Sequence, residues 1–274
     1  MNIFENNKYE DAGLKFDKNR VLTYSHLSCP LECRYCFVDD LNFNQKKGVA
    51  YLNENQFKLL EKLPEEIKLI MIGCDTEFFQ SKNNSLETLQ RLSELGKDIS
   101  VITKLDLNAD FIKKIGKVNK KLQEKGNQFS FSMSISCMES YTKWEPKTPE
   151  PEKRVKTLKL AYQEGIKTMV ALRPLLPDVS IEELEKIIVL TKDYCNGYYS
   201  GPLYLKNLDE DLIDRNDVNL IIEEEIQPHW MPNGNIFYKI TRKGQMENLS
   251  ELLIKYGKPL FEGAAEGMRY LKNI

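Results

Sequence analysis

The hydrophobic pattern alternates between short strand-like runs and longer helix-like segments through most of the chain. Ile67–Ile72 is a nearly continuous apolar run, which is typical of a buried parallel strand. Phe129–Ile135 alternates strictly between apolar and polar residues, and Ala109–Glu124 has helical spacing that ends at Gly126. Further strands are predicted at Val21–Ser25, Ile99–Thr103, Lys167–Leu172 and Tyr198–Leu205, and further helices at Asn55–Leu63, Ser85–Leu95, Glu152–Gln163 and Ile181–Asp193.

Residues at the predicted helix starts add local support. Ser85 and Ser180 are predicted N-caps, because their hydroxyls can accept a hydrogen bond from a free backbone N–H in the first turn. Glu183 is expected to complete a capping box with Ser180. These residues support the predicted starts of two helices.

The alternation of strands and helices predicts right-handed βαβ units and a parallel sheet. Counting from Val21 gives six strands, fewer than the eight of a closed barrel. We therefore predict an α/β fold, a partial (β/α)6 TIM-like barrel with a C-terminal cap. Chemistry in such sheets lies at the carboxyl ends of the strands.

Three regions follow from this pattern. Residues 1–20 are expected to form a loosely attached N-terminal arm, and residues 21–206 the partial barrel. Residues 207–274 break the pattern and are expected to cap the open barrel. Within them we expect a hairpin with a turn at Asn233-Gly234 and a helix over Met246–Tyr256.

Composition narrows the class of protein. The 39 Lys and Arg residues nearly balance the 41 Asp and Glu residues, so no overall basic field attracts nucleic acid. No run of eighteen apolar residues appears, so no membrane span is expected. Six cysteines in a chain without an apolar signal region indicate metal or redox chemistry rather than a disulfide framework. We expect a cytoplasmic location.

The most specific motif follows the first predicted strand directly. Cys29, Cys33 and Cys36 place three thiols within eight residues. Thiolates select zinc or iron–sulfur clusters over hard cations. A structural zinc site normally has four protein ligands, and a [4Fe–4S] cluster normally takes four cysteines. Three thiolates would leave one iron open for an external ligand, whereas an incomplete zinc site, with His26 nearby, is the alternative.

Polar residues follow several predicted strands in succession. Gly73–Glu77 comes after the second strand, and Thr103-Lys104 ends the third. Ser132 and Ser134 lie on the same face of the fourth, because strand side chains alternate with a period of two. Singly, such residues are equally consistent with helix caps and solvated loops. Together, at consecutive strand ends, they indicate a ligand site.

The cysteine spacing, ending in Tyr35-Cys36-Phe37, resembles the cluster loop of radical S-adenosylmethionine (SAM) enzymes. The order of segments from about Val21 to Leu205 resembles, more narrowly, spore photoproduct lyases and related DNA-repair-photolyase-like proteins. The segments that carry this resemblance are Cys74 with its following acid, Thr103-Lys104, Phe131–Ile135, Glu145-Pro146, Arg154, Gly165 and Pro174–Pro177.

The resemblance implies a role for each matching residue. Cys29, Cys33 and Cys36 would hold a [4Fe–4S] cluster whose open iron binds SAM. Lys104 and Ser134 would bind the SAM carboxylate. The remaining cofactor-binding candidates are Tyr35 and Phe37, which would flank the adenine, together with Thr76, Glu145 and Arg154.

Cys74 occupies the place of a cysteine that, in spore photoproduct lyases, returns a hydrogen atom to the product radical. The alternative is an ordinary buried cysteine at a strand end. The lyases have a tyrosine, thought to join the hydrogen relay, where this chain has Phe37, so this relay is not expected here.

The predicted function is reductive cleavage of SAM to a 5′-deoxyadenosyl radical that abstracts hydrogen from a substrate. The resemblance implies a nucleic-acid base or lesion as substrate, SAM as cofactor, and an electron donor such as flavodoxin or ferredoxin. Near-neutral charge also suits a peptide or small metabolite. A zinc-binding structural or interaction module is the alternative from another class.

Overall fold

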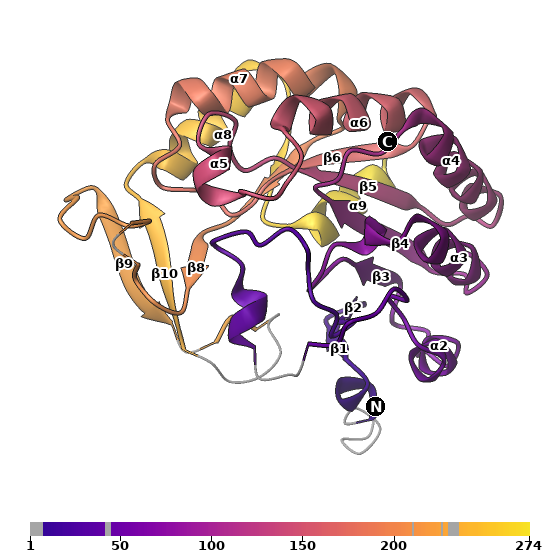
Figure 1. Ribbon diagram of the computed structural model, residues 1–274. Helices are drawn as coiled ribbons and strands as arrows, with labels where there is room; N and C mark the ends of the chain where they lie inside the picture. Colours follow the sequence, from indigo (N-terminus) through magenta and orange to yellow (C-terminus); the bar gives the residue numbers. More distant parts are fainter. Residues whose placement is uncertain (1–7, 42–44, 210, 226, 230–235) are drawn as a thin grey trace.

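The structure, a computed structural model of the 274-residue chain, describes all residues except 1–7, 42–44, 210, 226 and 230–235. It contains an eight-stranded sheet and a separate three-stranded sheet. Helices flank the larger sheet, and the smaller sheet projects from one end of it (Figure 1). No helix within the described residues is long and apolar enough to cross a bilayer.

The large sheet is parallel except at one edge. Its strand order is β1-β2-β3-β4-β5-β6-β7-β11, and β1 is antiparallel to β2. The predicted α/β partial barrel is therefore confirmed, with its six predicted strands corresponding to the series from β2 to β7. The strands are β1 (Leu14–Asp17), β2 (Arg20–Thr23), β3 (Leu69–Ile72), β4 (Asp98–Thr103), β5 (Phe129–Ser134), β6 (Lys167–Leu172), β7 (Tyr198–Ser200) and β11 (Leu260–Phe261).

Amphipathic helices bury one apolar face against this sheet. Helix α4 (Ala109–Glu124) begins where the Asn108 side chain accepts a hydrogen bond from Phe111 N at 2.9 Å. Its buried face includes Ile112 and Ile115, each worth about 1.5–3 kcal/mol of transfer free energy. The other helices along the strand series are α2 (Glu54–Leu60), α3 (Lys82–Leu92), α6 (Pro151–Gln163) and α7 (Ile181–Thr191), with short turns η1 (Phe37–Asp40), η2 (Phe78–Gln80), α5 (Tyr141–Trp144) and η3 (Lys192–Tyr194).

The start of one helix and the capping box of another differ from the predictions. Helix α3 begins at Lys82, so Ser85 lies inside its first turn, where its hydroxyl donates to the Lys82 carbonyl. Ser180 does cap α7 by accepting from Glu183 N. The Glu183 carboxylate, however, accepts backbone hydrogen bonds from Met138 at 2.6 Å and Glu139 at 2.8 Å. Glu183 therefore fixes the segment after β5 instead of completing a capping box.

The last predicted strand, Tyr198–Leu205, is two strands in two sheets. Its first part is β7, and its second part is β8 (Leu203–Leu205), which pairs with β10 (Phe237–Arg242). Pro202 lies between them and has no N–H to continue the β7 ladder, which explains the break. Strand β9 (Leu220–Glu225) completes the small sheet by pairing with β10. The predicted Asn233-Gly234 turn lies outside the described residues.

Both ends of the chain return to the large sheet. Part of the predicted N-terminal arm forms β1, so it is an integral edge strand rather than a loose attachment. Helix α8 (Gln245–Lys255) packs on α7, and β11 pairs with β7. Helix α9 (Ala264–Leu271) contacts β4 to β7, where Leu271 shares an apolar cluster with Met169 and Tyr199. The region after residue 206 thus contributes directly to the barrel.

Candidate functional site

The cysteine loop lies where the carboxyl end of β2 leaves the sheet. Its second and third thiols are joined by a tight turn in which Cys36 N donates to the Cys33 carbonyl at 2.9 Å. The loop is also tied to α5, because Arg34 N donates to the Trp144 carbonyl at 2.9 Å. Cys29, Cys33 and Cys36 are half-buried and free of disulfides.

The donor set of this loop suits a soft metal centre. Burial raises the pKa of Cys33 to about 11 and that of Cys36 to about 12, so both are protonated thiols here. Across the described part of the chain, no three His, Cys, Asp or Glu side chains are gathered closely enough to hold a metal ion. The fit to a metal centre therefore rests on the type of ligand and not on the present distances between the side chains. Three cysteine sulfurs in one short loop are suitable ligands for an iron–sulfur cluster with one open position.

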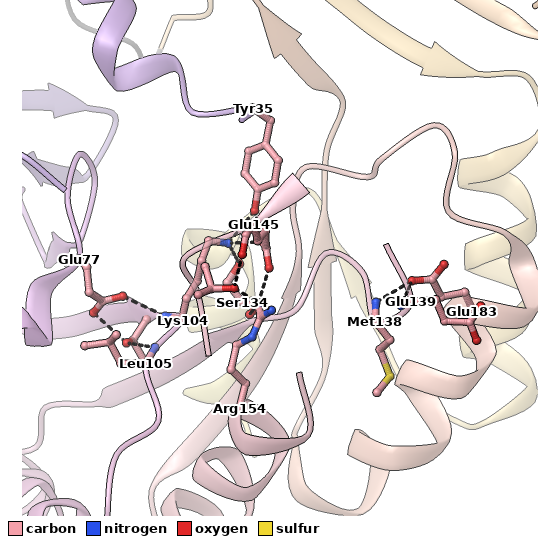
Figure 2. Close-up of polar contacts among 12 residues, drawn as sticks. Tyr35, Glu77, Lys104, Leu105, Ser134, Met138, Glu139, Glu145, Arg154 and Glu183 are labelled. Carbon is pink, nitrogen blue, oxygen red and sulfur yellow. Dashed lines mark hydrogen bonds and ion pairs between the residues drawn. The ribbon is translucent and has the colours of Figure 1, made fainter. Parts of the chain in front are cut away.

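Next to the loop, Lys104 is the centre of a buried polar network (Figure 2). This lysine follows β4, and its side chain is 15% exposed. Its Nζ donates to Tyr35 Oη at 2.8 Å, to Ser134 Oγ at 2.5 Å and to Glu145 Oε1 at 3.0 Å. These three bonds use all three donors of the ammonium group.

Glu145 and Arg154 complete the network, and both side chains are fully buried. Arg154 Nη1 donates to Glu145 Oε2 at 2.5 Å and to the Ser134 carbonyl at 3.1 Å. Tyr35 donates its phenol hydrogen to Glu145 Oε1. Burial alone would raise the pKa of Glu145, but Lys104 and Arg154 lower it to about 2. Two cations thus share one ionised carboxylate.

Glu77, which was not singled out as a site residue, fixes the backbone of this region. Its carboxylate accepts from Lys104 N at 2.9 Å and from the Thr103 hydroxyl at 2.8 Å (Figure 2). Burial raises the pKa of Glu77, and the hydrogen bonds that it accepts oppose this rise. Its position in a polar run directly after a buried strand was the available sequence signal.

The turn after β3 carries Cys74 and Thr76 on the other side of the loop. The Cys74 thiol donates weakly to the Met71 carbonyl at 3.5 Å, and burial raises its pKa to about 12. Thr76 Oγ1 donates to the Ser28 carbonyl at 3.3 Å, one residue before the cysteine loop. Asp75, between them, accepts from His26 N at 2.7 Å. Hydrogen bonds therefore fasten this turn to the start of the loop.

The structure separates the predicted site residues into groups. Five of them, each from a different segment, meet in the network around Lys104: Tyr35, Lys104, Ser134, Glu145 and Arg154. Cys74 and Thr76 lie together on the neighbouring strand end. Phe37 instead packs with Leu41 against Phe237 of the small sheet.

Comparison with known proteins agrees with this architecture. The sequence model of the Radical SAM superfamily matches residues 25–191. An uncharacterized protein of Methanocaldococcus jannaschii, MJ0683, is 26% identical over 194 residues, covering 66% of this chain and 69% of that protein. Its name states no activity.

Solved structures share the fold. A spore photoproduct lyase complexed with dinucleoside spore photoproduct matches with a TM-score of 0.61 and 14% identity, over 89% of this chain and 76% of the lyase. SuiB of Streptococcus suis matches with a TM-score of 0.54 and 12% identity, over 89% of this chain but only 50% of SuiB. At these identities the matches show a common architecture and leave the substrate open.

The family match covers the cysteine loop, the Cys74 turn and the Lys104 network, within more than half of the chain. Members of this family generally use a [4Fe–4S] cluster and SAM. The chain belongs to the radical SAM superfamily of enzymes.

Proposed function

We propose that this protein cleaves SAM reductively and uses the resulting radical on a substrate held at the carboxyl ends of the strands. Cys29, Cys33 and Cys36 would hold the [4Fe–4S] cluster. The bound cluster and SAM would supply one-electron cleavage of SAM to methionine and a 5′-deoxyadenosyl radical that abstracts hydrogen. The protein's own residues would bind and orient SAM and the substrate, and would exclude water from the site.

The buried network beside the cysteine loop is the observation that carries this proposal. Lys104 and Arg154 place two cations against the single carboxylate of Glu145. The SAM carboxylate would replace one of the three present acceptors of the Lys104 ammonium group and would accept a hydrogen bond from the Ser134 hydroxyl. Glu145 would hold Lys104 in position through their ion pair, and Arg154 would in turn hold Glu145.

The other cofactor contacts are assigned by their position around the loop. Tyr35 lies inside the loop, and the centroid of its ring is 6.3 Å from that of Trp144. We expect Tyr35 to contact one side of the adenine. Phe37 would contact the other side of the adenine, although in the structure Phe37 packs against Phe237. Thr76 joins the loop to the β3 turn and would contact SAM from that side.

Cys74 would act as the hydrogen-atom donor to the product radical. This role requires an S–H bond rather than a thiolate. Burial raises the pKa of Cys74 to about 12, which keeps the thiol protonated at neutral pH. In the transfer the S–H bond breaks and a C–H bond forms on the substrate, leaving a sulfur radical that the enzyme's reductant must reduce.

For the substrate we propose a nucleic-acid base or lesion, because a similar fold binds the dinucleoside spore photoproduct. Two lysines at the end of α4, Lys121 and the C-cap residue Lys125, both pair with Glu94, which offsets part of the positive charge of this helix. A peptide or small metabolite is the alternative, and the near balance of charge favours it. A flavodoxin or ferredoxin would supply the electron, in a cytoplasmic setting.

The test is anaerobic reconstitution with iron and sulfide, followed by metal analysis and incubation with SAM and dithionite. We expect about four irons per chain and release of 5′-deoxyadenosine. About one zinc per chain and no SAM cleavage would instead establish a zinc-binding module. Dinucleoside spore photoproduct is the first substrate to assay, and its cleavage to the two component nucleosides would establish lyase activity.

A steep loss of DNA binding with salt would support a nucleic-acid substrate, because phosphate contacts release counterions. Binding that does not change with salt, combined with active SAM cleavage, would favour the peptide or metabolite alternative.

A further inference from the structure

Tyr51 makes an unusual set of contacts with the turn that carries Cys74. Its phenol oxygen accepts hydrogen bonds from Gly73 N at 2.8 Å and from Cys74 N at 3.2 Å. The same hydroxyl donates to the Thr23 carbonyl at 2.9 Å. The Thr23 hydroxyl lies within donor distance of the same phenol oxygen, at 3.2 Å, so the one donor and two acceptor sites of the phenol are fully used at the two strand ends that it joins.

The Tyr51 ring is itself held rigidly. The side chain is 3% exposed, and its ring meets that of Phe78 edge to face, with centroids 5.1 Å apart. Phe78 is also buried. A fixed ring places the phenol oxygen at one position relative to β2 and β3.

The turn needs such a fixed partner because its backbone leaves the strand geometry. Gly73 has φ +85°, and a Cβ there would lie 3.0 Å from the Ile102 carbonyl oxygen. This conformation directs two successive N–H groups toward one acceptor instead of into the sheet. Without that acceptor both N–H groups, which are partly buried, would lose a hydrogen bond.

We propose that Tyr51 is a positioning residue for Cys74. Its phenol oxygen fixes the Gly73-Cys74 peptide and thereby sets where the thiol of Cys74 presents its hydrogen. Asp75 supports the same turn from the other end by accepting from Ser25 Oγ at 3.0 Å and from His26 N at 2.7 Å. The inference rests on the proposed role of Cys74 as hydrogen donor.

The first test uses the full chain without cofactor and compares Tyr51→Phe with the wild type. Amide hydrogen exchange at Gly73 and Cys74 should become at least roughly tenfold faster, because two partly buried N–H groups lose their acceptor. Peptide-resolved alkylation should show Cys74 reacting faster and at lower pH. Buried Cys137 and Cys195 serve as internal controls and should not change.

Tyr9→Phe is the matched control variant. Tyr9 is also buried, and its hydroxyl donates to the Lys62 carbonyl at 3.1 Å, in the turn after α2 rather than in the Cys74 turn. It should leave exchange and alkylation at Cys74 unchanged. Equal effects of the two variants, or wild-type exchange at Gly73 and Cys74 in Tyr51→Phe, would overturn the proposal.

The second test uses reconstituted holoenzyme with SAM and dithionite in D2O, without substrate. A thiol carrying solvent deuterium at the site can pass it to the 5′-deoxyadenosyl radical, and dithionite can then reduce the sulfur. Tyr51→Phe should lower the deuterated fraction of 5′-deoxyadenosine toward that of Cys74→Ala while SAM is still cleaved. An unchanged fraction in Tyr51→Phe, beside a lowered one in Cys74→Ala, would contradict positioning by Tyr51.

The two tests separate the two hypotheses. Absence of SAM cleavage in the wild type would refute the proposed function, whereas the exchange and alkylation results would still report on Tyr51. Equal deuteration in the wild type and Cys74→Ala would refute Cys74 as donor, and with it the catalytic meaning of its positioning.

Discussion

The two flanks of the cysteine loop are built in opposite ways. On the β4–β5 side, Lys104, Glu145 and Arg154 form a charged network of side chains. On the β3 side, Cys74 is an uncharged thiol placed by backbone N–H groups that bind Tyr51. The first flank suits binding of a charged ligand, and the second suits transfer of a hydrogen atom, so each construction matches its proposed task.

The difference between the two flanks also separates SAM binding from hydrogen transfer. Charges in a buried site are costly unless paired, so a network of this kind requires every member. A thiol costs little to bury, and what it needs is a defined position. Breaking the first flank should therefore affect stability and SAM binding, whereas breaking the second should mainly change the fate of the product radical.

The largest expected effect is that of Arg154→Met. It leaves Glu145 buried without its guanidinium partner and should lower the free energy of unfolding by about 3–5 kcal/mol. Urea unfolding of the purified chain measures this loss. The control is Lys147→Met, which removes an exposed ion pair with Glu32 and should cost at most about 1 kcal/mol. Similar losses in both variants would show that the network is not a stabilising unit.

The pH dependence of stability should reveal the same carboxylate. The pKa of Glu145 falls from 4.5 to about 2 on folding, so its stabilisation is fully present above the unfolded pKa. It is lost as pH falls through 4.5 toward 2, and amounts to about 3 kcal/mol at neutral pH. Urea unfolding at several pH values should show a shallower acid dependence in Glu145→Gln. An identical slope in both proteins would refute this assignment.

Lys104→Met should affect both folding and SAM binding. It removes one of the two cations paired with buried Glu145, and it takes away the charge-assisted donor proposed for the SAM carboxylate. We expect SAM affinity, measured by equilibrium dialysis of reconstituted enzyme, to fall at least about tenfold, equivalent to about 1.4 kcal/mol. An unchanged SAM affinity in Lys104→Met would show that the SAM carboxylate binds elsewhere.

The smallest effect is expected from Thr76→Val. It removes the hydroxyl bond to the Ser28 carbonyl while keeping the shape of the side chain. The free energy of unfolding should fall by about 1 kcal/mol, and SAM cleavage should slow only slightly. A loss as large as that of Arg154→Met would show that the two flanks are not as different as their contacts indicate.

Periodicity was sufficient to predict the parallel strand series, because its strands are short apolar runs such as Leu69–Ile72 or alternate between apolar and polar residues as in Phe129–Ser134. It could not predict β1 or β11, since a short strand such as Leu260–Phe261 carries no periodic signal and forms only because the chain returns to β7. Pro202 was the local signal that Tyr198–Leu205 divides, but a continuous β-rich run masked it.

The site was predictable to the extent that it lies in motifs. Three closely spaced cysteines and polar strand ends identify the rim, and Lys104, Ser134, Glu145 and Arg154 do meet there. Tyr51 was not predictable, because it lies in an irregular segment and acts through one hydroxyl on a distant turn. Such a contact depends on tertiary packing and leaves no pattern in the sequence.

The most direct test of the central claim is iron content and 5′-deoxyadenosine formation measured together in reconstituted wild type and Cys33→Ala. The account predicts about four irons per chain and SAM cleavage in the wild type, with both lost or strongly reduced in the variant. Full iron loading and SAM cleavage in Cys33→Ala would contradict it, as would a wild-type protein that binds zinc and leaves SAM intact.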